Sequence, residues 1–428
     1  MNAPTHPNAD PLDATTSDPH TLGWMQGHPP PADKIVRLAD GTHYQFPQSR
    51  WGFSHFRELM PTRAIERGGV VTELPLALRD DLDRVGFETL IGAQRMTLAQ
   101  SLGANFTDGI VVLQRGRIVF ERYFGALQPS RPHIAFSVTK SFIGLLGAML
   151  VHEGLLDEHA PVSHHVPELA GSAFGNASIR QLLDMTTGLD YSENYADPAA
   201  HVHAHVRAGS TLPREPGYTG PRSFYEFLQT VRPQGQHGQG FSYKTVNTDA
   251  LGWVIRRATG RGLSELLSER IWQPLGAEHD AYITLDSHGT EFAGGGLNTT
   301  LRDLARFGDM MRQGGRVVGH PAGYPAGRQI VPEAVVADIQ RGADPAHFAQ
   351  AGYALLPGWS YRNMWWVTHN AHGAYMARGV HGQMVYVDPT AEMVIARYAS
   401  HPQAANAHLD PTSLPAWHAI AKHLIANP

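Results

Sequence analysis

The chain contains no cysteine, and this absence removes several kinds of chemistry at once. Disulfides, cysteine-based zinc and iron–sulfur sites and thiol nucleophiles all require that residue. Lysine is scarce as well, because arginine supplies almost all of the positive charge, and the four lysines are Lys34, Lys140, Lys244 and Lys422. A lysine kept in such a chain is a candidate for work that arginine cannot do, such as giving up its proton.

The chain also lacks a strong charge excess and a long apolar run. Lys and Arg total 34 against 39 for Asp and Glu, a net charge of −5 that does not favour nucleic acid or an anionic membrane surface as a partner. The longest strongly apolar run, 142–151, is too short to cross a bilayer, and the polar first residues lack the pattern of a signal peptide. We therefore expect a cytoplasmic protein that acts on a small molecule without nucleic-acid or membrane partners; a homodimer is left open.

What is present is an ordinary globular composition over 428 residues, with 42% apolar and 17% charged residues. Residues 1–50, rich in Pro, Asp, Thr and His, are expected to form an N-terminal tail or surface strap. Two β-hairpins are predicted far apart in the chain, with strands at 110–114 and 118–124 and at 383–387 and 393–398. Helices are expected at 137–156, 179–185, 223–231, 248–259, 264–272, 301–312 and 415–426.

Strands from the two ends of a chain can pair in one sheet, because sheet pairing does not need sequence adjacency. We therefore predict an α+β fold (an α/β sandwich) with an antiparallel sheet flanked by helices. Residues 51–156 and 287–428 would form the sheet subdomain. Residues 157–286 would form an inserted, mainly helical subdomain.

The sharpest chemical signal is Ser137-Val138-Thr139-Lys140 at the start of the apolar helix. A Ser and a Lys three residues apart on a helix lie on one face, within reach of each other. A partly desolvated amine can take the proton of a weakly nucleophilic hydroxyl, and the positive end of the helix dipole favours the negative charge that develops. The alternative is that Ser137 is only an N-cap and that Lys140 extends to solvent.

Two further segments carry candidate groups. Tyr243 and the block Asn247-Thr248-Asp249 lie between the glycine-rich loop at 235–240 and the next helix. His381 and Gly382 lie in the segment 378–383 that enters the late hairpin. By themselves these segments are equally typical of an ordinary loop tyrosine and of a turn at a strand edge.

A Ser-x-x-Lys helix start, a Tyr-containing loop and a late His-Gly, in this order and spacing, resemble the penicillin-recognising serine hydrolases. Within that group the chain is most similar to the branch of class C type β-lactamases, related esterases and 6-aminohexanoate-dimer (nylon oligomer) hydrolases, and to the last of these above all. The resemblance runs from about residue 50 to the C-terminus and rests on the blocks 136–141, 166–172, 183–185, 193–199, 243 with 247–249, 303–306, 365–366 and 379–383.

This resemblance implies a β-lactamase/transpeptidase-like fold, an acyl-enzyme mechanism on amide or ester bonds, and no cofactor or metal. It implies that Ser137 is the nucleophile, that Lys140 eases its deprotonation and that Tyr243 shuttles a proton. The backbone N–H groups of Ser137 and Val380 would hold the oxyanion. The implied substrate-binding residues are Tyr195, Val206, His381, Gly382 and Trp366.

Two departures from the family bear on the substrate. His381 stands where β-lactamases carry a lysine, and a mostly neutral histidine grips a carboxylate less firmly. Val206 stands where the nylon oligomer hydrolases place an acidic residue against the substrate's ammonium, so a neutral ester or amide suits this pocket better, unless Glu215 or another acid substitutes. For the pair that would move protons, we expect burial to lower the pKa of Lys140 and a nearby cation to lower the pKa of Tyr243.

Alternatives remain within the family and outside it. A β-lactamase or a D-amino-acid amidase or peptidase would use the same site. A metal site is a rival, because His201, His203 and His205 would share one face of a strand, although a solvated loop is the favoured interpretation of that segment. A catalytically inert binding module would keep the fold without the chemistry.

Overall fold

The two ends of the chain meet in the largest sheet of the computed structural model, which describes residues 12–318 and 327–428. This sheet is antiparallel and has the order β13-β14-β15-β16-β17-β4-β5. Its strands are β13 (Ser360–Arg362), β14 (Trp365–Val367), β15 (Tyr375–Arg378), β16 (Met384–Asp388), β17 (Met393–Ala399), β4 (Thr107–Gln114) and β5 (Arg117–Tyr123). The late strand β17 pairs with the early strand β4, with Ile395 opposite Val112. The predicted α+β class and both predicted hairpins are therefore confirmed.

A second sheet places the start of the apolar helix. It has the order β1-β9-β10-β6, formed by β1 (Thr62–Ile65), β9 (Ala281–Thr284), β10 (Leu297–Thr299) and β6 (His133–Ile134). Directly after β6, the Ala135 N–H donates to the Leu297 carbonyl at 2.8 Å. Three two-stranded pairs complete the described strands: β2 (Gly86–Glu88) with β3 (Arg95–Thr97), β7 (Leu189–Asp190) with β8 (Arg232–Pro233), and β11 (Arg316–Val317) with β12 (Arg328–Gln329).

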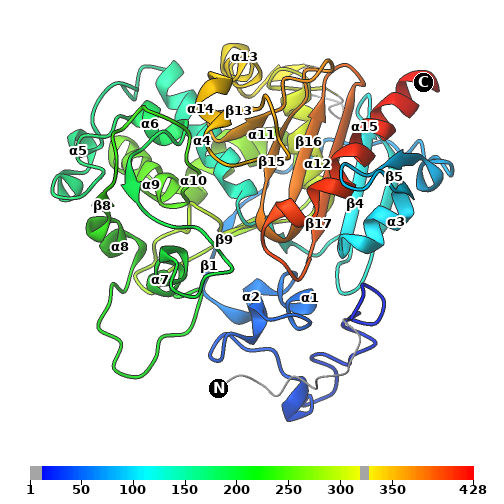
Figure 1. The fold of residues 1–428 in the computed structure, drawn as a ribbon, viewed down its shortest axis with the longest axis horizontal. Coiled ribbons are helices and arrows are strands. Elements are labelled where there is room, and N and C mark those ends of the chain that lie inside the picture. The colour runs from blue at the N-terminus through cyan, green and yellow to red at the C-terminus, as the bar shows by residue number, and fades with distance from the viewer. Residues whose placement is uncertain (1–11, 319–326) are drawn as a thin grey trace.

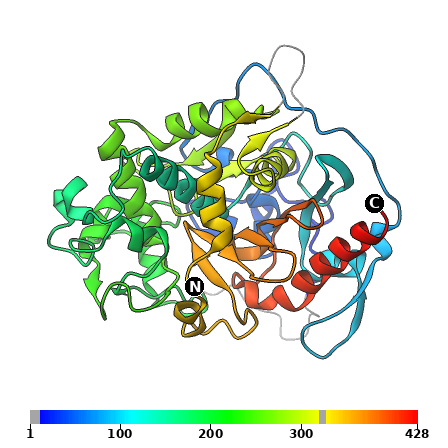
Figure 2. The ribbon, with the colours of Figure 1, turned by 90° about the horizontal axis from the view of Figure 1, so that it is seen from above.

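Helices cover both faces of the large sheet (Figure 2). On one side lies α12 (Leu301–Arg312), and on the other lie α15 (Asp410–Ala426) and α3 (Leu98–Ala104). A helical block lies beside the sheet (Figure 1) and includes α5 (Val162–His165), α6 (Ile179–Leu183), α7 (His201–Ala208), α8 (Phe224–Thr230), α9 (Val246–Thr259) and α10 (Leu263–Leu267). The remaining helices are α1 (Ser49–Gly52), α2 (Phe56–Leu59), α11 (Gln273–Leu275), α13 (Glu333–Arg341) and α14 (Pro345–Ala349).

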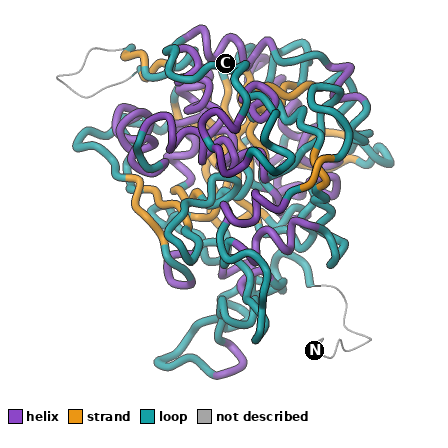
Figure 3. The backbone as a smooth tube through the Cα atoms, turned by 90° about the vertical axis from the view of Figure 1, so that its left-hand side faces the viewer, coloured by secondary structure: helices purple, strands orange, loops and turns teal. Residues whose placement is uncertain are grey.

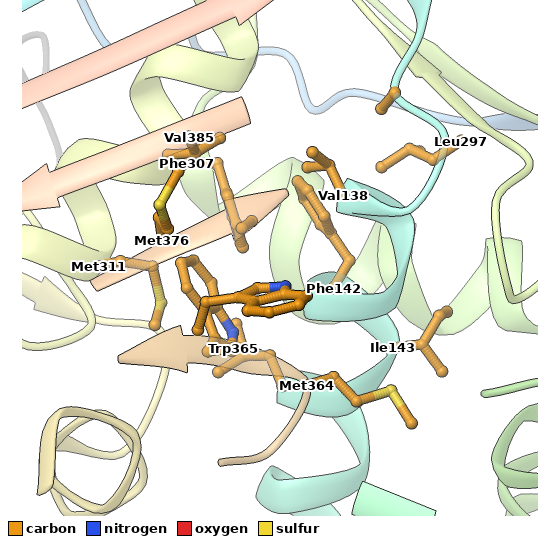
Figure 4. Packing of buried hydrophobic residues seen from close by; sticks show 14 of the residues in the cluster. Val138, Phe142, Ile143, Leu297, Phe307, Met311, Met364, Trp365, Met376 and Val385 are labelled. Carbon is orange, nitrogen blue, oxygen red and sulfur yellow. The ribbon is translucent and has the colours of Figure 1, made fainter. Parts of the chain in front are cut away.

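The apolar helix α4 (Val138–His152) runs through the core between the sheet and the helical block. Its Phe142 ring stacks on Phe307 of α12 with 3.7 Å between ring centroids, and Trp365 of β14 lies beside them (Figure 4). Gly144 lets the helix approach the β13–β14 turn, because a Cβ at this position would lie 2.4 Å from the Asn363 carbonyl oxygen. This packing fixes the helix that carries Ser137 and Lys140.

Three segments differ in detail from the sequence prediction. Residues 201–208 form helix α7, where a solvated loop or a strand was expected. The last helix begins at Asp410, five residues before the predicted start, with Pro411 in its first turn. Residues 268–272 continue the predicted helix as a π-helical turn.

The N-terminal segment 12–50 is mostly loop and lies at one end of the molecule (Figures 1 and 3). It is tied to the sheet by buried polar contacts: Arg50 contacts Asp108 of β4 at 3.3 Å and donates to the Ala14 carbonyl at 2.9 Å. Tyr44 of this segment packs against Phe53, Phe56 and Phe136 and so reaches the region of Ser137.

Candidate active site

Ser137 and Lys140 are in direct contact at the start of α4. The Lys140 Nζ donates to Ser137 Oγ at 2.8 Å and to the Gly294 carbonyl at 2.6 Å, and the lysine is only 1% exposed. The Ser137 side chain caps none of the free N–H groups of the helix. The alternative of a simple N-cap beside a solvent-exposed lysine therefore does not describe this turn.

Burial changes the proton affinity of this amine. It lowers the pKa of Lys140 from 10.5 to about 8, while the negative charges of Glu193 and Asp249 act in the opposite direction. Desolvation disfavours a charged amine more strongly than these acids favour it. A free amine is consequently available next to Ser137 Oγ near neutral pH.

Tyr243 belongs to the same cluster, since the Lys140 Nζ lies 5.2 Å from the centroid of its ring. The expectation that a nearby cation lowers the pKa of this phenol is wrong. Burial raises the pKa of Tyr243 well above 10, and Glu193 raises it further, against the weaker effects of Ser137 and Arg378. The phenol therefore keeps its proton at neutral pH, and no local pattern in the sequence indicates the burial that causes this.

The end of β15 abuts the start of α4. A Cβ added to Gly379 would lie 2.7 Å from the Ala135 carbonyl oxygen and 3.1 Å from the Ser137 nitrogen, so only a glycine permits this approach. Val380 follows, and it lines the same two cavities as Ser137. The two backbone N–H groups predicted to hold an oxyanion are thus brought to one place.

The first cavity beside Ser137 has a volume of about 420 Å³. Three of the predicted substrate-binding residues, Tyr195, Val206 and His381, line it. Val206 lies on α7, which forms one wall. From the sequence, no role is assigned to several other lining groups, among them Tyr44, Phe292 and His408.

The second cavity, of about 390 Å³, also has Ser137 in its lining and is lined by Tyr243 and Trp366. The guanidinium of Arg378 lies 5.0 Å from the Trp366 ring centroid and pairs with the Asp410 carboxylate at 2.5 Å. Gly382 lines neither cavity: it is buried, and its carbonyl accepts from Arg397 Nε at 3.0 Å.

His381 faces the first cavity as a neutral group. Burial lowers its pKa to about 4, and its Nδ1 lies 2.7 Å from the His401 carbonyl oxygen. A neutral imidazole offers no positive charge to a substrate carboxylate. The only carboxylate that lines both cavities is Glu193, and Glu215 lines neither.

Glu193 is held rigidly. Its carboxylate accepts from Tyr195 Oη at 2.8 Å, from the Thr245 N–H at 2.7 Å and from Thr245 Oγ1 at 2.6 Å. Sequence reasoning quoted this residue in a family block without assigning it a role. Its position two residues before Tyr195 was the only signal.

The three histidines of α7 do not converge. His201 Nδ1 accepts from the Ser192 N–H at 3.1 Å, His203 lines the first cavity, and His205 is buried with its Nε2 3.0 Å from Asp249 Oδ2. The helix separates side chains that a strand would have aligned. Across residues 12–318 and 327–428 no group of three or more His, Asp or Glu residues is arranged to hold a metal ion.

The same described ranges contain no helix that is both long enough and apolar enough to cross a membrane.

The fold and this cluster define a class: a serine hydrolase in which a buried lysine contacts the candidate nucleophile at the N-terminus of the central helix. The beta-lactamase family profile matches residues 97–414, so the chain belongs to the beta-lactamase family. A 6-aminohexanoate-dimer hydrolase of Paenarthrobacter ureafaciens is 35% identical over 382 residues, which cover 89% of this chain and 91% of that protein.

Two further comparisons point the same way. A solved structure of a Bacillus anthracis protein named for the 6-aminohexanoate-dimer hydrolases superposes with a TM-score of 0.82 at 31% identity, covering 92% of this chain and 99% of that chain. Esterase EstB of Burkholderia gladioli is 28% identical over 188 residues, or 41% of this chain and 47% of that protein. The predicted family resemblance is confirmed.

Proposed function

We propose that this hydrolase cleaves amide or ester bonds of small carboxylic acid derivatives through an acyl-enzyme on Ser137. The observation that carries the proposal is the 2.8 Å contact between Ser137 Oγ and an amine that is almost completely buried. With the pKa of Lys140 lowered to about 8, the free amine can accept the hydroxyl proton as the Oγ–carbon bond forms.

The negative charge then moves to the substrate carbonyl oxygen. The N–H groups of Ser137 and Val380 would receive it, and each such donor typically contributes about 10²–10³ in rate. When the bond to the leaving amine or alcohol breaks, the leaving group needs a proton, which Tyr243 can donate because burial keeps its phenol protonated. Tyr243 would recover the proton from Lys140. Water then repeats the sequence on the acyl-enzyme and releases the acid.

The first cavity supports a largely apolar substrate part. Val206 and Phe292 line it, and His381 adds no charge. A β-lactam carboxylate would find no lysine or arginine among the described residues that line it. Glu193 is the one acid among the described residues that line this cavity, so we expect cleavage of the 6-aminohexanoate dimer, the substrate in the relative's name, to depend on Glu193 being available despite its three hydrogen bonds.

A fluorophosphonate probe followed by peptide mass spectrometry tests the nucleophile. Label is expected on Ser137 in the wild-type chain and none at this position in Ser137→Ala. A wild-type protein that takes no label, and hydrolyses no member of a panel of short-chain p-nitrophenyl esters, linear amides, D-amino-acid amides and cephalosporins, would instead be an inert binding module. The cytoplasmic location remains a prediction from the sequence, and a homodimer stays open.

A further inference from the structure

Gly294 supplies one of the two acceptors of the catalytic amine, at 2.6 Å from Lys140 Nζ. The position of this carbonyl therefore fixes where the amine lies relative to Ser137 Oγ. The Gly294 N–H donates to Asp249 Oδ1 at 2.9 Å. A Cβ at Gly294 would lie 2.4 Å from Thr245 Cγ2, so only a glycine fits at this position between Lys140 and Asp249. Asp249 thus binds the N–H of Gly294, and the carbonyl of Gly294 in turn binds the amine of Lys140.

Asp249 lies on α9 and is itself buried, with 2% exposure. Its second oxygen, Oδ2, lies 3.0 Å from Nε2 of His205, which is fully buried on α7. The two atoms approach closely without an aligned hydrogen bond, and neither makes a hydrogen bond to any other group in the part of the chain that the structure describes. A buried carboxylate without polar neighbours is costly, and the polar groups beside Asp249 are the Gly294 N–H and the imidazole of His205.

The other ring nitrogen of His205 contacts Tyr191. Burial raises the pKa of Tyr191 well above 10, so its hydroxyl stays protonated, and it lies 3.1 Å from His205 Nδ1. The imidazole is thus placed between the Tyr191 hydroxyl on one side and the Asp249 carboxylate on the other.

We propose that Asp249 and His205 are positioning residues for Lys140: His205 supports the buried carboxylate, and the carboxylate fixes Gly294 and the charge around the amine. The proposal rests on the proposed function in one respect, namely that Lys140 accepts the proton of Ser137. The other titratable groups that face Lys140 are Glu193 and Tyr243.

The arrangement also links the proton acceptor to the substrate cavity. Val202, His203 and Val206 of α7 line the first cavity, while His205 of the same helix turns into the core toward Asp249. A displacement of α7 would therefore move His205 relative to Asp249, and through Asp249 it would change the position of Gly294. This makes α7 both a wall of the substrate site and a support of the catalytic amine.

The scarcity of lysine makes the first test direct. In the full chain labelled with 13Cε-lysine there are four lysines to resolve, and the Lys140→Arg variant assigns one signal. Asp249→Asn keeps an acceptor for the Gly294 N–H but removes a negative charge, so the Lys140 signal should titrate about one pH unit lower than in the wild type. An unchanged titration in a folded Asp249→Asn protein would overturn the proposal.

The second test uses His205 and separates positioning from mere stability. His205→Phe should lower kcat on a short-chain p-nitrophenyl ester more than tenfold with KM within twofold, and His205→Gln, which retains an amide donor, should restore most of kcat. The matched control is His201→Gln, an exposed histidine of the same helix that does not contact Asp249. Equal losses in the Phe and Gln variants, or a pure KM effect, would contradict the role.

The outcomes of these experiments distinguish a failure of the positioning role from a failure of the proposed function. If Ser137→Ala retained activity, the proposed function would be wrong whatever Lys140 titration showed. If Ser137→Ala is inactive but the Asp249 and His205 variants behave like wild type, only the positioning role is lost. Should Asp249→Asn not fold, the comparison of His205→Phe with His205→Gln decides.

Discussion

Replacing Lys140 with methionine should remove a cost to the fold whose size can be worked out. The pKa of Lys140 is lowered by burial from 10.5 to about 8. The folded chain therefore binds fewer protons than the unfolded chain between these pH values, and its stability rises with pH across this window. A change of 2.5 units at 1.36 kcal/mol per unit corresponds to about 3 kcal/mol. This penalty is fully present below pH 8 and absent above pH 10.5.

Guanidinium unfolding of wild type and Lys140→Met at several pH values from 7 to 10.5 measures the effect. The methionine replaces the four-atom stem of the lysine but lacks the terminal nitrogen and its bonds to Ser137 and Gly294, which adds an offset that does not depend on pH. On top of that offset, the stability of the variant relative to wild type should decrease by about 3 kcal/mol as the pH rises through the window.

Lys422→Met, at an exposed lysine of α15, is the matched control for the loss of an ammonium. A difference between wild type and Lys140→Met that stays constant from pH 7 to 10.5 would refute the reasoning, because the pKa of the buried amine would then not be lowered.

The same pKa predicts that wild-type kcat/KM rises by almost tenfold per pH unit below pH 7 and levels off above pH 8 to 9.

Four further substitutions test other parts of the site and fold. Ser137→Ala should reduce ester turnover by about 10⁶, and retention of most activity would exclude it as the nucleophile. Tyr243→Phe should lower kcat far more than it raises KM; an effect on KM alone would argue against proton donation. Val206→Asp should raise activity on substrates with a free ammonium relative to neutral esters, and no change would mean that the ammonium lies elsewhere. Gly144→Ala places a Cβ 2.4 Å from the Asn363 carbonyl oxygen and should cost about 1–3 kcal/mol, seen as a lower Tm with no change in the pH profile.

The sequence was sufficient for those parts of the fold that rest on local pattern. The hairpin strands β4–β5 and β16–β17 alternate or run apolar between clear turns, and α12 was expected at the same residues at which it is found, 301–312. Ser137 and Lys140 could be paired because one helical turn joins them.

Other features depend on contacts that no local pattern records. The alternating histidines of 201–205 fit a strand as well as a short helix, and the helix buries His205 against Phe227 and Asp249, which come from other parts of the chain. The raised pKa of Tyr243 follows from burial between elements distant in the sequence. Glu193 and Arg378 enter the site for the same reason, since their neighbours come from other parts of the chain.

The pairing of β17 with β4 has a consequence for how the protein is made. During synthesis the ribosome delivers the helix with Ser137 early, and the segment after β15 that carries Val380 only near the end. A prematurely terminated product that ends before β14 therefore possesses Ser137 and Lys140 but lacks both Val380 and the cavity wall with Trp366. We therefore expect hydrolytic activity only from a chain that has been translated almost to its full length.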